Sequence, residues 1–301
     1  MGPWVSPFRE GNLDWRSRCS FVAFLRALAA VGSILLLAAS VVLAACTPKK
    51  IDAGDWQCAP LAIGAAGASQ YPAITDPVSV PWSTDFEDGF CGYPKQYGPG
   101  YCYGDAPYIL VTEPHHSGHL AAEFKVIGDG QKQTRCVRHG ELPEAAYYGA
   151  WYYIPEALKD VTGAWNLWHF QGGDDPDSQH DLWDVSLGKG AKEGEWDLTV
   201  LDRPSGFVTY RRPETSRIPV PMGSWFHIEL FLKRRADATG EIALYQDDEE
   251  LFHQRNLKSE ASKFTQWYVG DYALGATPAD SHLYVDDVSI SAARTSISAT
   301  P

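Results

Sequence analysis

Short apolar runs separated by Gly, Pro and Asp occupy the chain from about residue 81 to residue 293. The runs are rich in β-branched and aromatic residues, and Phe226–Lys233 alternates apolar and polar positions with the period of a half-buried strand. Asp247 and Asp248 separate two runs and predict a hairpin turn. Only Pro155–Asp160 resembles a short helix. The pattern predicts an all-β antiparallel sandwich of two sheets. The predicted strands are Tyr108–Thr112, His119–Val126, Tyr147–Ile154, Trp165–Phe170, Leu182–Leu187, Trp196–Leu201, Trp225–Lys233, Glu241–Gln246, Gln266–Val269 and Leu283–Ile290.

The first 45 residues follow a different pattern. Arg16, Arg18 and Arg26 lead into Ala27–Ala45, which contains no charge, and small residues then lead to Cys46. This is the layout of a secretory signal. Leu43–Cys46 resembles the lipobox of bacterial lipoproteins, in which the cysteine is lipidated and becomes the first mature residue. The alternative is an uncleaved membrane anchor, because the run approaches the roughly 20 residues that span a bilayer. Either reading places the rest of the chain on the extracytoplasmic side.

Residues 46–80 are rich in Ala, Gly, Pro and Ser and show no sustained period. Such a composition is typical of a flexible tether. We therefore divide the chain into a signal peptide (1–45), a lipidated cysteine with a linker (46–80), a β-domain (81–293) and a C-terminal tail (294–301). The division predicts a lipid-anchored protein of the cell membrane or cell surface.

Four cysteines follow the lipobox. An even number in an exported chain predicts two disulfides, for which three pairings exist. We favour the local pair Cys91–Cys102, which leaves Cys58 for Cys136. Zinc ligation is the less favoured alternative, because no CxxC spacing is present among them.

Negative charge dominates the chain. The net charge is −13, and removal of residues 1–45, with four arginines and two acids, makes it −15. This sign disfavours nonspecific binding to nucleic acid or anionic lipid. A local exception is the cluster of Arg203, Arg211, Arg212 and Arg217, which either gathers an acidic polysaccharide or is an ordinary solvated loop.

Several longer motifs resemble a known family when they are taken in order. Asp85–Gly89 opens the series and Tyr284–Ile290 closes it. Their order is similar to that of the concanavalin A-like jelly rolls, over about residues 81–293. Within that superfamily the chain is most similar to heparin-lyase-I-like and alginate-lyase-like polysaccharide lyases. The resemblance implies a jelly-roll fold. The fold by itself does not decide the activity, because lyases, glycosidases, lectins and binding modules all use it. The inner motifs are Gly149–Glu156, Trp165–Gln171, Met222–Glu229 and Gly240–Asp247.

The chain also departs from these families. Arg135–Arg138 lacks the acid of the alginate-lyase Arg-x-Glu strand, and Gln266–Tyr272 lacks the lysine of their late strand. The Glu-x-Asp-x-x-Glu strand of laminarinase-type glycosidases is absent from the sequence. Its nearest counterparts, Asp181 and Asp184, are three positions apart and are expected on opposite strand faces. They would be a poor pair for glycoside hydrolysis, which needs two carboxylates across one bond.

β-Elimination from a uronic-acid polysaccharide needs a cation for the substrate carboxylate, a base for the C5 proton and an acid for the leaving oxygen. His169 is the candidate base, and Gln171 lies two positions along on the same strand face. The alternatives are noncatalytic ligand binding and a structural polar network. The other candidates are Arg135 or Arg138 for the carboxylate and Tyr268 or Tyr272 for the acid.

Tryptophans beside the predicted strands are candidates for stacking on sugar rings, and the arginines at 211 and 212 are candidates for contacts to an acidic polymer. The alternative is that most of the rings fill the core. Trp165 and Phe170 are expected on opposite faces of one strand, so at least one of them should be inside. The candidate platforms are Trp165, Trp168, Trp183 and Trp267.

Calcium is the one metal that the resemblance implies. Glu87 and Asp287 are similar to the terminal carboxylates that hold a structural Ca²⁺ in many related binding modules, and hard oxygen ligands suit this ion. We expect no required cofactor and a monomer. The sequence thus predicts an exported surface lipoprotein that binds, and cleaves by β-elimination, an extracellular polysaccharide. The alternative is a noncatalytic, lectin-like surface protein.

Overall fold

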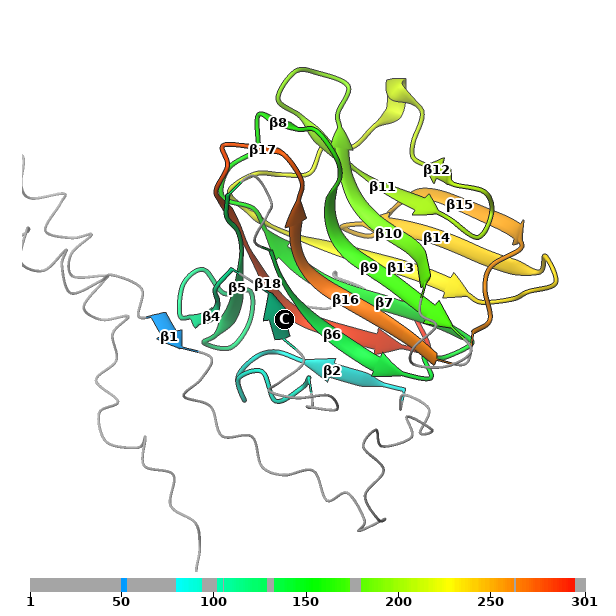
Figure 1. Cartoon of the computed structure of the whole chain (residues 1–301), viewed down its shortest axis with the longest axis horizontal. Coiled ribbons are helices and arrows are strands. Elements are labelled where there is room, and N and C mark those ends of the chain that lie inside the picture. Colours follow the sequence, from blue (N-terminus) through cyan, green and yellow to red (C-terminus); the bar gives the residue numbers. More distant parts are fainter. Residues whose placement is uncertain are drawn as a thin grey trace, which may run out of the picture. The chain divides into compact units, whose positions relative to one another are not determined.

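Two antiparallel sheets form a sandwich in the computed structural model (Figure 1). The signal segment, Cys46, Cys58 and most of the predicted linker lie outside the residues that the structure describes. None of the helical segments within the described part of the chain is long and apolar enough to cross a membrane. The described residues are 50–52, 80–93, 102–104, 106–128, 133–173, 180–262 and 264–295.

The larger sheet has nine strands, all paired antiparallel. A short strand, β2 (Trp82–Thr84), pairs with β18 (Ser281–Ser291) beside the main path. The strand β1 lies inside residues 46–80, which we expected to be a linker. The strands along the main path are, in order, β1 (Lys50–Asp52), β4 (Tyr108–Val111), β5 (Ala121–Val126), β18 (Ser281–Ser291), β7 (Ala145–Tyr153), β13 (Trp225–Lys233), β14 (Gly240–Gln246) and β15 (Glu249–Leu257).

The smaller sheet has seven strands and carries the candidate site. A separate two-stranded sheet pairs β8 (Asp160–Val161) with β17 (Ala276–Thr277). In the sequence these two strands come directly before β9 and directly after β16 of the seven-stranded sheet. The strands of the seven-stranded sheet are, in order, β12 (Val208–Tyr210), β11 (Trp196–Asp202), β10 (His180–Lys189), β9 (Trp165–Gly173), β16 (Phe264–Ala273), β6 (Thr134–Gly140) and β3 (Cys102–Gly104).

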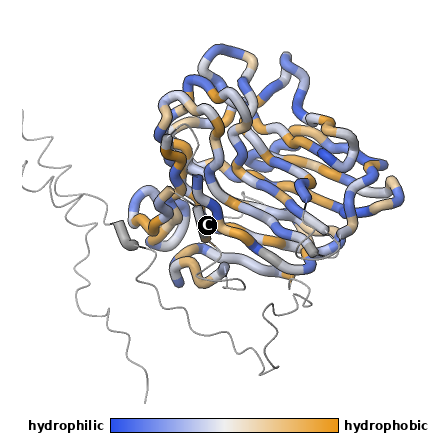
Figure 2. The backbone as a smooth tube through the Cα atoms, viewed as in Figure 1, coloured by the Kyte–Doolittle hydropathy of each residue, from blue (hydrophilic) through white to orange (hydrophobic). Residues whose placement is uncertain are grey.

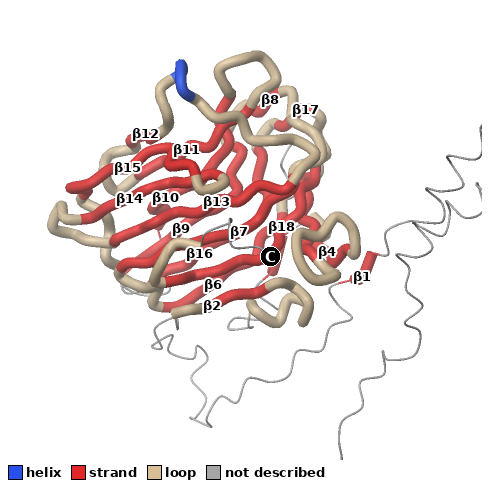
Figure 3. Tube along the Cα trace, turned by 180° about the vertical axis from the view of Figure 1, so that it is seen from behind, coloured by secondary structure: helices blue, strands red, loops and turns tan. Residues whose placement is uncertain are grey.

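The all-β prediction is confirmed. The helix that we expected near Pro155–Asp160 is wrong, since this segment has no helical turn, and the described part of the chain has one 3-10 turn at Glu214–Ser216 (Figure 3). The predicted hairpin is correct. Asp247 and Asp248 have φ angles of 49° and 67° between β14 and β15, which is the left-handed pair that a two-residue hairpin turn of type I′ requires.

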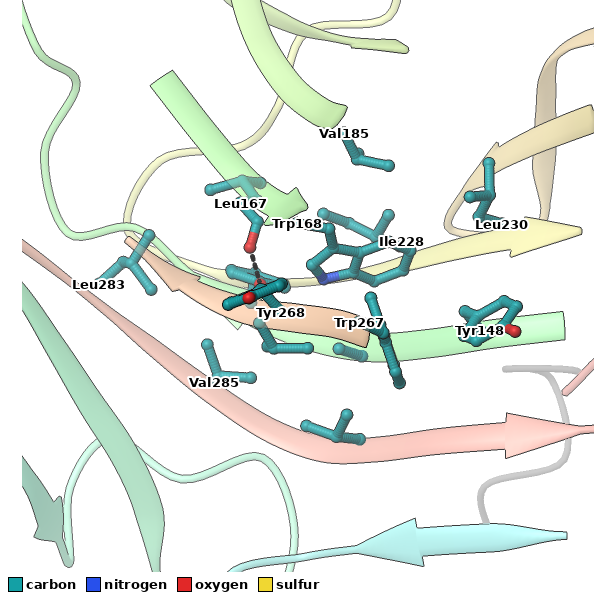
Figure 4. Close-up of a cluster of buried hydrophobic side chains, with 14 of the residues drawn as sticks. Tyr148, Leu167, Trp168, Val185, Ile228, Leu230, Trp267, Tyr268, Leu283 and Val285 are labelled. Atoms are coloured by element: carbon teal, nitrogen blue, oxygen red, sulfur yellow. Dashed lines mark hydrogen bonds between the residues drawn. The ribbon is translucent and has the colours of Figure 1, made fainter. Parts of the chain in front are cut away.

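The core lies between the two sheets. Trp168 of β9 and Trp267 of β16 pack edge to face, with ring centroids 5.3 Å apart, and Tyr148 of β7 approaches Trp267 at 5.0 Å. Ile228 and Leu230 of β13 lie in the same cluster (Figure 4). Hydrophilic and hydrophobic segments alternate along the strands (Figure 2), as expected when one face of each sheet is buried.

The four candidate stacking tryptophans belong to this core, so the prediction that they bind substrate is wrong. Trp165, Trp168, Trp183 and Trp267 are at most 1% exposed. A β-bulge explains why Trp165 is buried. Val185 pairs with Trp168 and Ser186 with Asn166, which leaves Leu167 as an extra residue in β9. The extra residue switches the alternation, so Trp165 and Phe170 are both buried.

A disulfide joins Cys102 of β3 to Cys136 of β6. The two cysteines lie directly opposite each other in the sheet. The predicted pairs Cys91–Cys102 and Cys58–Cys136 are therefore wrong, because strand pairing brought together two cysteines that are 34 positions apart. Cys91 is also disulfide-bonded.

Candidate functional site

A cavity of about 370 Å³ opens on the face of the seven-stranded sheet that points away from the core. It runs over β9 and its two neighbours, β10 and β16, which lie side by side in Figure 1. Five of the six residues predicted for catalysis line it. The residues that line it include Arg135, Asn166, His169, Gln171, Asp181, Arg203, Tyr268, Asp271, Tyr272 and Leu274.

Strand alternation positions the centre of the site. Trp168 and Phe170 of β9 point into the core, so His169 and Gln171 point into the cavity. His169 pairs with Asp184 on β10 and with Tyr268 on β16. The bulge at Leu167 brings Asn166 to the same face, although it is an odd number of positions from His169. Three adjacent strands thus present polar side chains to one cavity.

Two carboxylates hold the His169 imidazole. Its Nδ1 is hydrogen-bonded to Oδ1 of Asp184, and its Nε2 lies 3.1 Å from Oδ1 of Asp181. We expected these two aspartates on opposite faces, which is wrong. β10 carries a bulge at Leu182, because Asp181 pairs with Gln171 and Trp183 with Phe170. The extra residue turns both carboxylates toward the histidine.

The two carboxylates differ in their surroundings. Asp184 is 2% exposed, and its Oδ2 accepts a hydrogen bond of 2.6 Å from Nη2 of Arg203. Partial burial by itself would raise the pKa of Asp181. The hydrogen bond of 2.9 Å from Nε2 of Gln171 and the charges of His169 and Arg203 outweigh burial and hold that pKa below its usual value. Asp181 is therefore ionised at neutral pH beside Nε2.

Tyr268 completes a connected polar network. Its hydroxyl lies 2.7 Å from Oε1 of Gln171 and is also hydrogen-bonded to Oε1 of Gln266. Its ring centroid is 5.3 Å from that of His169. Gln171 accepts from the tyrosine and donates to Asp181, so the network runs from the Tyr268 hydroxyl to the imidazole. Two groups that can exchange protons thus flank one position in the cavity.

Arg135 supplies positive charge at the same place. Its Cζ lies 5.4 Å from the ring centroid of Tyr268 and 5.2 Å from that of Tyr272, within the range of a cation–π contact. Arg138 does not line the cavity, so its predicted role there is wrong. It is three positions along β6 and faces the other way, with its guanidinium 5.2 Å from the Trp82 ring, and burial lowers its pKa.

Of the arginine cluster, Arg203 lines the cavity, whereas Arg211 and Arg212, which we expected to contact an acidic polymer, do not. Arg211 is paired with Asp197 and donates to the carbonyl of Lys189 at 2.7 Å. Arg212 donates to Oε1 of Glu249 at 2.8 Å. Neither lines the cavity, so their predicted contact with substrate there is wrong, whereas Arg203 reaches the cavity through Asp184.

Sequence reasoning missed Asn166, Asp184 and Asp271 as parts of the site. Burial raises the pKa of the Asp271 carboxyl to about 7, even though Nε1 of Trp165 donates to it at 3.1 Å. Asn166 lies on the other side of the bulge at Leu167 from His169 and Gln171. The alternation of the sequence therefore did not show that Asn166 shares their face. In the sequence, Asp184 drew attention only together with Asp181, as a pair of carboxylates for glycoside hydrolysis.

Glu87 and Asp287, the predicted calcium ligands, both form hydrogen bonds to the segment 116–120. Oε1 of Glu87 accepts from the backbone N–H groups of His119 at 2.6 Å and Leu120 at 2.7 Å. Asp287 accepts from the Ser117 hydroxyl at 2.8 Å and contacts His116 at 2.6 Å. The described residues contain no group of three or more His, Cys, Asp or Glu arranged for a metal. The calcium site at Glu87 and Asp287 stays a prediction.

Comparisons with known proteins agree with the resemblance found in the sequence. A family model described as polysaccharide lyase matches residues 100–289. No curated protein matches the chain. The endo-β-1,4-glucuronan lyase of the fungus Trichoderma reesei has 17% identity and a TM-score of 0.48, over 63% of this chain and 87% of that one. An alginate lyase of Aplysia kurodai has 13% identity and a TM-score of 0.43, over 63% and 88%. An alginate lyase from Chlorella virus has 10% and 0.40, over 58% and 86%.

Proposed function

The chain belongs to the polysaccharide lyase family, and from this membership we propose that its cavity cleaves a uronic-acid polysaccharide by β-elimination. One observation carries the proposal: Arg135, His169 and Tyr268 meet in a single cavity on three neighbouring strands. A cation and two proton-exchanging groups around one sugar position are what this reaction requires.

The cation acts first in this scheme. The guanidinium of Arg135 pairs with the carboxylate of the sugar and withdraws charge from it, which makes the proton on C5 more acidic. Asn166, which lines the same cavity, offers its amide group to the sugar, while Gln171 holds Tyr268 and Asp181 in place. Charge that develops on the carboxylate during proton removal is stabilised in place by the fixed cation.

His169 is the proposed base. The hydrogen bond to Asp184 makes Nδ1 the donor, so Nε2 of the neutral ring is the nitrogen that takes the C5 proton when the sugar replaces Asp181 beside it; Asp184, and Asp181 once its contact re-forms, stabilise the imidazolium. The electrons of the C5–H bond form the C4–C5 double bond, and the C4–O bond breaks with its electron pair on oxygen. That oxygen takes the proton of the Tyr268 hydroxyl. Atoms and charge balance without a cofactor.

A panel of uronic-acid polysaccharides tests the proposal. It should include glucuronan and alginate, which appear in the names of the similar proteins, with a neutral glucan as the control. We expect ultraviolet absorbance of unsaturated products to rise with at least one acidic polymer and not with the glucan. Binding to an acidic polymer without any rise would overturn cleavage and leave the lectin-like alternative.

We also propose that the protein is an exported lipoprotein with its β-domain outside the membrane. The pattern of Leu43–Cys46 and the disulfide between Cys102 and Cys136 support this, because structural disulfides persist in oxidising compartments. Cys46→Ala should release the protein from membranes or block its processing. Unchanged attachment of that variant would support a spanning anchor instead.

A further inference from the structure

A second cavity adjoins the first. Its volume is also about 370 Å³, and it shares the side chains of Asp181 and Arg203 with the cavity around His169. Because the two cavities share these lining residues they are adjacent, so a chain-like ligand bound in the first would extend toward the second. The residues that line the second cavity are His180, Asp181, Arg203, Pro204, Phe207 and Glu260.

The second cavity lies toward one end of β9. His180 pairs with Gly172 near the C-terminal end of this strand. Leu274, which lines the first cavity, follows the β16 residue that pairs with Trp165 at the other end. The combined groove therefore runs along β9, with its polar centre at His169. Both ends carry an exposed apolar side chain, Leu274 at one and Phe207 at the other.

Phe207 is an unusual surface residue in two respects. Its side chain is 69% exposed, the largest fraction among the exposed large apolar residues of the described chain. Its φ is 63°, a left-handed conformation that is rare for a bulky residue and persists only where the surroundings impose it. Neither feature stabilises the fold, because an exposed ring gains no burial and a left-handed bulky residue is strained.

A short turn imposes this conformation and points the ring at the groove. The N–H groups of Gly206 and Phe207 donate to the carbonyl of Arg203 at 2.9 and 3.4 Å, and Ser205 N–H donates to Asp202 at 3.1 Å. The Arg203 guanidinium lies 5.7 Å from the centroid of the Phe207 ring. Arg203 thus links the Phe207 ring to Asp184 and, through Asp184, to His169.

We propose that Phe207 is the platform of a second sugar subsite, which takes the next pyranose unit of the polysaccharide that His169 acts on. The proposal rests on the proposed function. The ring stacks on the apolar C–H face of the sugar. Asp181 and Glu260 accept hydrogen bonds from its hydroxyl groups, since carboxylates are acceptors only. Two acids in this cavity disfavour a sugar carboxylate turned toward them, so the unit is recognised by its ring face and hydroxyls.

Chain-length dependence tests the subsite. The substrates are oligomers of increasing length from the polymer that the wild type cleaves best. We expect Phe207→Ala to lower kcat/KM about tenfold for long oligomers, the factor that corresponds to 1.4 kcal/mol. It should leave kcat/KM of the shortest cleaved oligomer unchanged and shift the product sizes, while Phe207→Trp keeps the wild-type profile. Val208→Ala is the matched control, because Val208 is 38% exposed, adjacent, and lines neither cavity.

The outcomes separate this inference from the proposed function. Cleavage by the wild type with the same length dependence in Phe207→Ala would overturn the subsite and leave the lyase proposal intact. If the wild type cleaves no polymer, calorimetric titration with a long polyglucuronate oligomer decides. A Kd about tenfold weaker for Phe207→Ala than for wild type and Val208→Ala would support the subsite alone. Equal Kd values, or no binding to wild type, would overturn it.

Discussion

Asp184 and His169 lie opposite each other on β10 and β9, and the buried carboxylate of Asp184 is hydrogen-bonded to Nδ1 of the imidazole. The second oxygen of Asp184 is held by Arg203 at 2.6 Å. Both oxygens of this carboxylate are therefore engaged, so the orientation of the histidine ring depends on a group that solvent does not reach. This pair organises the proposed reaction centre.

Asp184→Asn should lower kcat at least a hundredfold with little change in KM, because an amide favours the wrong imidazole tautomer and does not stabilise an imidazolium. The measurement is the rate of formation of unsaturated product. Asp160→Asn is the control, since Asp160 forms an exposed ion pair with Lys189 away from the cavity. A kcat within twofold of the wild type for Asp184→Asn would show that the ring needs no such partner.

His169→Ala should lower kcat by about 10²–10⁴-fold, the range of general base catalysis, while binding to the polymer persists. His253→Ala provides the comparison, because His253 is paired with Glu241 on the other sheet and lines neither cavity. Activity and polymer binding should be measured on the same preparations. Full activity of His169→Ala would remove this residue from the mechanism.

Arg135→Gln should reduce kcat/KM by about 10²–10³-fold, because the developing charge on the sugar carboxylate loses its fixed cation. Arg212→Gln removes the same charge from the surface pair with Glu249 and should leave kcat/KM unchanged. The pair of variants separates local from global charge. Equal losses for both would mean that general electrostatic attraction, and not the cavity, accounts for the effect.

Asp271→Asn should flatten the pH dependence of stability. The folded pKa of Asp271 is raised to about 7 from its ordinary value near 3.8, so its protonated form is favoured in the folded state. Its contribution is present below pH 4 and is lost as the pH rises toward 7. Between pH 4 and 8 the wild type should lose about 2–4 kcal/mol of unfolding free energy more than the variant. Urea unfolding at several pH values measures this, and parallel curves would contradict it.

Removing the disulfide with Cys102→Ala and Cys136→Ala should lower the free energy of unfolding. The bridge spans 34 positions, and closing a loop of this size contributes about 3–4 kcal/mol through the unfolded chain. Urea unfolding of the double variant against the wild type gives the difference. Each single variant serves as a comparison, and an unchanged midpoint for all three would show that strand pairing alone holds β3 on β6.

Much of the site could be predicted because it depends on local alternation. His169 and Gln171 share a face since they are two positions apart within one uninterrupted stretch of β9, and the chemistry of elimination pointed to an arginine and a tyrosine near them. Strand-forming residues and turn residues also determined the all-β fold, because these preferences act over a few neighbours.

Tertiary structure decided the rest. Single extra residues, Leu167 in β9 and Leu182 in β10, turned Trp165 inward and brought Asp181 and Asp184 to one histidine, and a sequence does not announce where such a bulge will form. Pairing of β3 with β6 decided that Cys102 bonds Cys136. Local periodicity is determined by the sequence alone, whereas faces beyond a bulge and partners across a sheet depend on how distant strands pack.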